Sequence, residues 1–185
     1  MNTGIFKRFL LVNNQRRSFH YYTKQKLDKI KIGFRTVGKG SVDFQKITRN
    51  VGVITLNNPE KKNALSGKML VELHDLVSEL NNERCNFDDV KGVILTGNGN
   101  IFSSGGDLKT LHVYCKKSQE RGHEMSCLTH DISKTFQELS QLSVALINGR
   151  AVAGGAEMAL FTDMRAFVED IGMCVCIVYT ITPHN

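Results

Sequence analysis

The 185-residue chain lacks the cysteine and histidine spacings that mark disulfide-rich or metal-binding proteins. Its five cysteines include no Cys-x-x-Cys pair, and its six histidines include no His-x-x-x-His pair. An odd number of cysteines without such spacing argues against a disulfide framework and against a zinc site. We therefore expect no bound metal, and a reducing compartment fits this sequence best.

Several functional motifs are absent as well. The sequence contains no Gly-x-x-x-x-Gly-Lys-Ser/Thr phosphate loop, no convincing Gly-x-Gly-x-x-Gly dinucleotide fingerprint and no Gly-x-Ser-x-Gly nucleophile elbow. The apolar stretch at residues 171–182 is far shorter than the roughly 20 residues that a membrane-spanning helix needs. These absences argue against a nucleotide-binding fold of those types, against a hydrolase of that type and against a membrane span.

The N-terminal part of the chain lacks acidic residues. Residues 1–27 contain no Asp or Glu, whereas six of the 24 Lys and Arg residues lie there, and the remaining 18 equal the 18 acids. The pI of about 9.1 therefore describes this segment and does not indicate a nucleic-acid-binding surface. Its composition fits a mitochondrial transit peptide or a disordered basic tail, and we expect residues 1–40 to form an arm outside the core.

Hydrophobic patterning predicts one α/β domain, with buried and mostly parallel strands, over residues 41–170. Strand-like runs occupy residues 46–59, 90–97 and 143–152. Helical patterns follow an N-capping Ser66 and occupy residues 108–117 and 129–142. The polar residues 117–127 are expected to form an irregular surface segment.

Two segments share one design, in which an apolar strand is followed by a glycine-rich turn and then a helix. They read "VILTGNGNIFSSGGDLKTL" and "VALINGRAVAGGAEMAL". Helix N-termini leave backbone N–H groups unbonded and carry partial positive charge, so two such turns can together bind a negatively charged oxygen. A Gly-Gly pair before a helix can equally be a close-packing joint, and the pattern alone leaves both interpretations open.

Three segments in order and spacing resemble the crotonase (enoyl-CoA hydratase/isomerase) superfamily: "LNNPEKKNALSGKML", "IFSSGGDL" and "NGRAVAGGAEMAL". The resemblance covers roughly residues 42–165 and implies a spiral core of ββα units, incomplete at its C-terminus. Within the superfamily, the segments look most like members that decarboxylate ethylmalonyl-CoA or methylmalonyl-CoA through an enolate. The alternatives are an enoyl-CoA hydratase or isomerase of fatty-acid metabolism and an inactive, truncated fragment that binds acyl-CoA.

The same resemblance implies roles for individual residues. The two donors of the oxyanion hole fall on the backbone N–H groups of Gly106 and Gly154. Glu157 matches the glutamate that hydratases use as acid and base, although it could instead cap its helix. Asp163 is expected to be structural.

Further positions match the lining of the coenzyme A site in the family: Lys61, Lys62, Ala64, Ser104 and Asp107. The two lysines could meet CoA phosphates or could be solvated loop charges. Asp107 is expected to act as a helix cap rather than as a base. Coenzyme A would be part of the substrate, and the resemblance implies no metal or redox cofactor. The balanced charge outside the N-terminal segment gives no reason to expect a nucleic-acid partner.

The sequence departs from the family pattern at two places. Ala153 replaces the first of three glycines, and beyond Asp170 an apolar tail, residues 171–185, replaces the further sequence of other members. We therefore expect a truncated product with an exposed core face and poor solubility. Full-length members are implied to be trimers or hexamers. The resemblance favours the cytosol, whereas the basic arm favours mitochondria.

Overall fold

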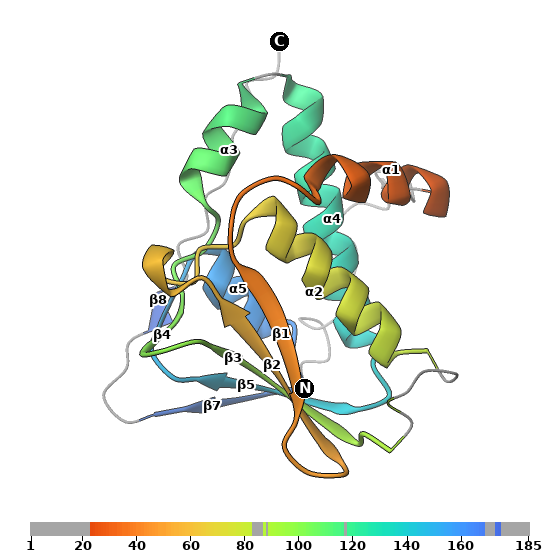
Figure 1. The fold of residues 1–185 in the computed structure, drawn as a ribbon, viewed down its shortest axis with the longest axis vertical. Helices are drawn as coiled ribbons and strands as arrows, with labels where there is room; N and C mark the ends of the chain where they lie inside the picture. Colours follow the sequence, from red (N-terminus) through yellow and green to blue (C-terminus); the bar gives the residue numbers. More distant parts are fainter. Residues whose placement is uncertain (1–22, 83–86, 88, 117, 169–172, 175–185) are drawn as a thin grey trace, which may run out of the picture.

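The computed structural model describes residues 23–82, 87, 89–116, 118–168 and 173–174, and these form an α/β arrangement of two sheets and several helices (Figure 1). The larger sheet has the strand order β1-β2-β3-β5-β7. Its strands are β1 (Ser41–Lys46), β2 (Val51–Asn57), β3 (Gly92–Gly97), β5 (Leu142–Ile147) and β7 (Met164–Phe167). Only β1 runs antiparallel to its neighbour, so the expected mostly parallel sheet is confirmed.

A smaller sheet contains three short parallel strands in the order β4-β6-β8. They are β4 (Ile101–Ser103), β6 (Arg150–Val152) and β8 (Met173–Cys174). From β3 onward, successive strands alternate between the large sheet and the small one. The chain therefore advances as a spiral in which each turn contributes one strand to each sheet.

The helices complete the turns of this spiral. They are α1 (Lys24–Phe34), the short 3-10 helix η1 (Pro59–Lys61), α2 (Gly67–Leu80), α3 (Leu108–Cys115), α4 (Gln119–Gln137) and α5 (Gly154–Leu160). The predicted cap of α2 is confirmed, since Ser66 Oγ accepts a hydrogen bond from Met69 N at 3.2 Å. In the described part of the chain, no helix has the length and apolar character needed to cross a membrane.

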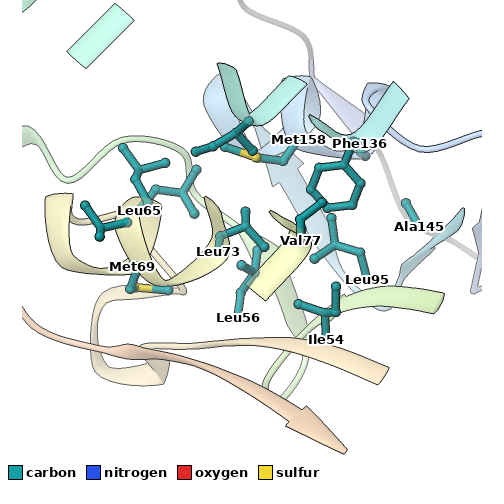
Figure 2. Close-up of a cluster of buried hydrophobic side chains, with 14 of the residues drawn as sticks. Ile54, Leu56, Leu65, Met69, Leu73, Val77, Leu95, Phe136, Ala145 and Met158 are labelled. Atoms are coloured by element: carbon teal, nitrogen blue, oxygen red, sulfur yellow. The ribbon is translucent and has the colours of Figure 1, made fainter. Parts of the chain in front are cut away.

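The hydrophobic core lies between the large sheet and the helices (Figure 2). Strand β2 buries alternate residues, including Ile54 and Leu56, because successive side chains of a strand point to opposite faces. Helix α2 presents Leu73 and Val77 to the same core at helical spacing. Burying a side chain of this size contributes roughly 1.5–3 kcal/mol.

The expected N-terminal arm of residues 1–40 is wrong in its C-terminal part. Residues 24–34 form α1, whose Ile30 and Phe34 are buried, and the Phe34 ring stacks on Tyr114 with centroids 4.6 Å apart. The basic composition of this segment gave no sign of a buried helix, although Ile30 and Phe34 are four residues apart, which is a helical spacing. Residues 1–22 lie outside the described residues.

The irregular segment expected at residues 117–127 is also wrong, since residues 119–127 form the first half of α4. The side chain of Ser118 caps this helix by accepting a hydrogen bond from Arg121 N at 3.3 Å. Met125 and Leu128 start a buried stripe that Ile132 continues. A narrow stripe on an otherwise polar helix is a weak signal, because few of its residues are apolar.

The run at residues 143–152 proves to be two strands rather than one. Strand β5 joins the large sheet, the chain turns at Asn148 and Gly149, and β6 joins the small sheet. Within the tail of residues 171–185, Met173 and Cys174 pair with Ala151 and Val152 as β8, so this part of the tail joins the fold. The remainder of the tail lies outside the described residues.

Candidate active site

The two glycine-rich turns lie side by side. The first turn, residues 103–107, starts at the last residue of β4, and the second turn, residues 152–155, starts at the last residue of β6 and includes the first two residues of α5. Strands β4 and β6 are parallel neighbours, with Ser103 paired to Ala151. Because the carboxyl ends of parallel strands meet at one edge of a sheet, both turns emerge together, and each leads into a helix, the first into α3 and the second into α5.

The backbone N–H groups of Gly106 and Gly154 lie close to each other across the two turns. A Cβ atom built on Gly154 would lie 3.6 Å from Gly106 N, and one built on Gly105 would lie 3.1 Å from Gly154 N. Within the described ranges, we find no protein acceptor for the N–H of Gly106 or of Gly154. Two donors are therefore available at one place.

The direction of the Gly106 N–H follows from its bridge to Leu65. The carbonyl oxygen of Gly105 accepts a hydrogen bond from Leu65 N at 2.7 Å, and Asp107 N donates to Leu65 O at 2.9 Å. A peptide's C=O and N–H point in opposite directions. The Gly106 N–H therefore points away from Leu65, out of the bridge.

The two glycines that open α5 serve different purposes. A Cβ on Gly155 would lie 2.5 Å from Ser103 O, which is closer than real Cβ atoms approach. A Cβ on Gly154 would make only ordinary contacts, at 3.6 to 3.9 Å. Gly155 is thus the packing joint between helix and strand, whereas packing against the protein does not require glycine at position 154.

Glu157 lies in the first turn of α5 and is half-buried. Its backbone N donates to Ala153 O at 3.0 Å, but its side chain does not cap the helix. Among the residues that the structure describes, no hydrogen bond or ion pair engages its carboxylate. The carboxylate is therefore available for proton transfer.

The first turn is bound to residues 61–65, which include the predicted coenzyme A loop. Ser104 N donates to Lys62 O at 2.9 Å, and Ser104 Oγ donates to Lys61 O at 3.2 Å. Lys61 Nζ lies 2.7 Å from a carboxylate oxygen of Asp107. The structure therefore brings these predicted residues together around Gly106.

Asp107 is the N-cap of α3, as predicted, since its carboxylate accepts a hydrogen bond from Lys109 N at 3.1 Å. The residue is 5% exposed. Burial by itself raises the pKa of this carboxyl group, but hydrogen bonds from Lys61, Thr110 and Lys109 outweigh burial and leave the pKa below 3.8. Asp107 is thus an ionised cap that secures the start of α3.

The remaining residues predicted for the coenzyme A site differ in exposure. Lys62 is exposed and has left-handed backbone angles, φ 55° and ψ 41°. Ala64 is only 7% exposed, and its carbonyl oxygen accepts a hydrogen bond from Asn58 Nδ2 at 3.0 Å. Lys62 thus faces solvent, whereas the Ala64 side chain is mostly covered by protein.

Sequence reasoning missed Asn63 and Ser103, which are both fully buried between these segments. Asn63 Nδ2 donates to Asn98 O at 2.9 Å and to Ile101 O at 2.7 Å, while its Oδ1 accepts from Asn58 N at 3.0 Å. Its backbone is left-handed, with φ 53°. Asn63 stands between Lys62 and the apolar residues Ala64 and Leu65, and a short amide side chain at such a place could have indicated a buried turn residue.

Ser103 Oγ joins the two segments. It donates to Asn63 O at 2.7 Å and accepts from Gly105 N at 3.1 Å. The N–H of Gly105 is thereby engaged inside the protein, in contrast to the N–H of Gly106. A serine after a short strand gives no sequence signal for this role, because the role depends on contact with a distant loop.

Ala153 belongs to the second turn, whereas Asp163 lies beyond the other end of α5. Ala153 has φ 48° and ψ −122°, a backbone region that favours glycine. Asp163 accepts hydrogen bonds from Ser143 N at 2.8 Å and Ser143 Oγ at 2.7 Å, so its structural role is confirmed. These bonds link the end of α5 to the start of β5.

A sequence model of the enoyl-CoA hydratase/isomerase family matches residues 46–170, more than half of the chain. A protein from Bos taurus named ethylmalonyl-CoA decarboxylase is 40% identical over 131 residues, covering 71% of this chain and 41% of its own length. The Homo sapiens protein of that name is 37% identical over 131 residues, with the same two coverages of 71% and 41%. The chain thus spans less than half the length of these curated relatives.

Solved structures give the same fold. An enoyl-CoA hydratase from Bacillus anthracis matches with a TM-score of 0.64 and 30% sequence identity, over 71% of this chain and 49% of that one. One from Polaromonas matches with a TM-score of 0.66 at 21% identity, over 72% of this chain and 50% of that one, which supports the fold alone. The α/β spiral predicted from the sequence is therefore confirmed.

Proposed function

Since this chain belongs to the enoyl-CoA hydratase/isomerase family, we propose that it acts on an acyl-CoA thioester. The thioester carbonyl oxygen lies between the N–H groups of Gly106 and Gly154 and accepts a hydrogen bond from each. The observation that carries this proposal is the proximity of two backbone donors without a protein acceptor in the described residues. Such donors stabilise negative charge as it develops on the oxygen.

The proposed reaction is the decarboxylation of ethylmalonyl-CoA or methylmalonyl-CoA. The bond between the α-carbon and the carboxylate carbon breaks, carbon dioxide leaves, and the electron pair forms a thioester enolate. The enolate oxygen is held by the two N–H groups, and the α-carbon then takes up one proton. The names of the similar proteins from Bos taurus and Homo sapiens support this choice of substrate.

Glu157 supplies or orients the final proton in this proposal. Its carboxylate has no partner among the described residues, and Glu157 lies in the first turn of α5, three residues after Gly154. The reaction needs no metal and no redox cofactor, because the oxyanion hole stabilises the enolate and carbon dioxide leaves without oxidation. Coenzyme A takes part only as the substrate's carrier.

The test is turnover of the purified full chain with ethylmalonyl-CoA, followed as carbon dioxide release and butyryl-CoA formation. Gly154→Ala should lower kcat roughly a hundredfold, since its methyl group would lie 3.6 Å from Gly106 N and would crowd the oxygen that both donors bind. Gly92→Ala in β3, whose new Cβ would lie 3.5 Å from Leu142 O in β5, is the matched control and should retain activity. Equal activity of both variants would contradict the oxyanion hole.

A second candidate is hydration of an enoyl-CoA, which the unpaired carboxylate of Glu157 and the likeness to the Bacillus anthracis hydratase favour. In that reaction Glu157 would take a proton from water as the water oxygen bonds to the β-carbon, the electron pair of the double bond would form the enolate, and the α-carbon would then take up a proton. Hydration of crotonyl-CoA without carbon dioxide release would assign this activity. Binding of acyl-CoA without turnover of either substrate would instead identify an inactive binding fragment.

A further inference from the structure

Lys61 and Lys62 are neighbours in sequence but occupy different environments. Lys61 Nζ lies 2.7 Å from Asp107 Oδ2, and the two side chains are 37% and 6% exposed. Lys62 is exposed, and no ion pair involves it in the described part of the chain. The charge of Lys61 is thus already matched by a buried carboxylate, whereas that of Lys62 is available to a ligand.

The ion pair lies at the end of the contact between residues 61–65 and the first turn. Asp107 directly follows Gly106, and Leu65 binds the peptide groups on both sides of Gly106. Lys61 therefore holds the first turn through its ion pair with the side chain of Asp107, while Leu65 holds it through backbone hydrogen bonds. Releasing Lys61 would free one end of the segment that fixes the direction of the Gly106 N–H.

We propose that Lys61 is a positioning residue that holds the Gly106 N–H toward the thioester oxygen, and that of these two lysines it is Lys62 whose charge is available to the phosphates of coenzyme A. This inference rests on the proposed acyl-CoA function. It replaces the expectation that both lysines line the coenzyme A site. Lys61 then acts on the transition state through Asp107, whereas Lys62 acts on binding through charge.

A substrate without phosphates separates the two roles. Ethylmalonyl-pantetheine carries the same thioester as ethylmalonyl-CoA but lacks the nucleotide and its phosphate groups. Lys61→Met should lower kcat about tenfold with both substrates, because a displaced donor weakens transition-state binding whichever carrier is present. Lys62→Met should raise KM for the CoA thioester several-fold, by roughly the effect of one lost charge pair, without a matching fall in kcat.

Three further variants control for folding and for charge. Lys61→Arg keeps the positive charge and should restore most of kcat. Asp107→Asn keeps an N-cap acceptor but loses the ion pair, so it should reproduce the fall in kcat of Lys61→Met. Lys46→Met removes an ion pair of the same 2.7 Å length, between Lys46 and Asp89, and should leave kcat and KM unchanged.

The inference is overturned if the kcat defect of Lys61→Met disappears with the pantetheine substrate, since Lys61 would then act on phosphate. Lack of turnover by the wild-type chain would contradict the proposed function but would still leave positioning measurable. In that case the amide NMR signal of Gly106 should shift in Lys61→Met and Asp107→Asn but not in Lys46→Met. An unchanged Gly106 signal in the first two variants would overturn the inference.

Discussion

The two turns that present Gly106 and Gly154 share one design but are held in place by different interactions. The first turn is hydrogen-bonded along its length to residues 61–65, through both backbone and side-chain groups. In the second turn, Ala153 has a backbone conformation that favours glycine, and its side chain does not cap the helix that follows. It is fixed by close packing, most tightly where Gly155 meets Ser103.

This difference teaches that a backbone donor can be positioned in two ways. Hydrogen bonds hold the first turn, so substitutions of polar side chains should disturb it. Steric contact holds the second turn, so the exchange of glycine and alanine should disturb it. Loss of a polar side chain should therefore affect the first turn most, and exchange of glycine and alanine should affect the second turn most.

The largest effect is expected at Asn63 beside the first turn. Asn63→Ala removes the amide that bonds Asn98 O, Ile101 O and Asn58 N, and it leaves buried backbone groups unpaired. The free energy of unfolding should fall by about 3 kcal/mol, because each unsatisfied buried group costs about 1–3 kcal/mol. Urea denaturation followed by circular dichroism measures this loss.

Asn57→Ala is the matched control for this substitution. Asn57 also uses both ends of its amide, toward Asp43 at 2.7 Å and Asn98 at 2.8 Å, but these bonds are exposed to solvent. Its loss should cost less than about 1 kcal/mol, since water replaces the partners. Equal losses for the two variants would refute the buried network as the support of the first turn.

A somewhat smaller effect is expected at Gly155 in the second turn. Gly155→Ala would place its Cβ 2.5 Å from a backbone oxygen of Ser103, so the helix or strand must move. Overpacking of this kind costs about 2 kcal/mol, which thermal unfolding would detect as a lower midpoint. Gly154→Ala should not lower the midpoint, because its new Cβ makes only ordinary contacts. A lower unfolding midpoint for Gly154→Ala would contradict the conclusion that, of these two glycines, only Gly155 is required for packing.

Much of the fold was predictable because it depends on local pattern. The apolar spacing after Ser66 predicted α2 and its cap, and the β-branched run at residues 90–97 predicted β3. The division of residues 143–152 between two sheets was not predictable, because the strand-like run continues across Asn148. Which strand pairs with which depends on segments that are far apart in the chain, and a single sequence does not show which of these segments come together.

The candidate site divides in the same manner. The positions of Gly106 and Gly154 followed from the order of strand, turn and helix together with family resemblance. The roles of Asn63 and Ser103 did not, because they depend on contacts 35 to 40 residues away in sequence. The ion pair of Lys61 with Asp107, 46 residues apart, was missed for the same reason.

Removing the backbone strain at Ala153 should stabilise the protein. With φ 48° and ψ −122°, Ala153 occupies a region that costs a residue with a Cβ roughly 1–3 kcal/mol. Ala153→Gly should therefore raise the free energy of unfolding by about 1 kcal/mol. The gain is smaller than the strain energy because glycine also increases the conformational entropy of the unfolded chain. Ala156→Gly, in the interior of α5, should have the opposite sign. A destabilised Ala153→Gly variant would contradict the assignment of strain to the second turn.

The smallest effect is a pH dependence at the first turn. The folded-state pKa of Asp107 lies below the ordinary value of 3.8, so its ionised form stabilises the fold above that pH. This contribution is lost as pH falls below 3.8 through the lowered folded-state pKa. At neutral pH it should amount to about 0.5–1 kcal/mol, typical of an ion pair with a partly exposed lysine.

Asp107→Asn should reduce the loss of stability on acidification without abolishing it, because the pKa of Asp163 is also lowered, by hydrogen bonds from Ser143. Urea denaturation at neutral pH and at a pH below 3.8 measures this difference. Asp163→Asn should reduce the acid loss as well, yet only Asp107→Asn should move the amide signal of Gly106. If both variants moved that signal equally, the position of Gly106 would not depend specifically on the interactions of the first turn. The proposed difference between the two turns would then be wrong.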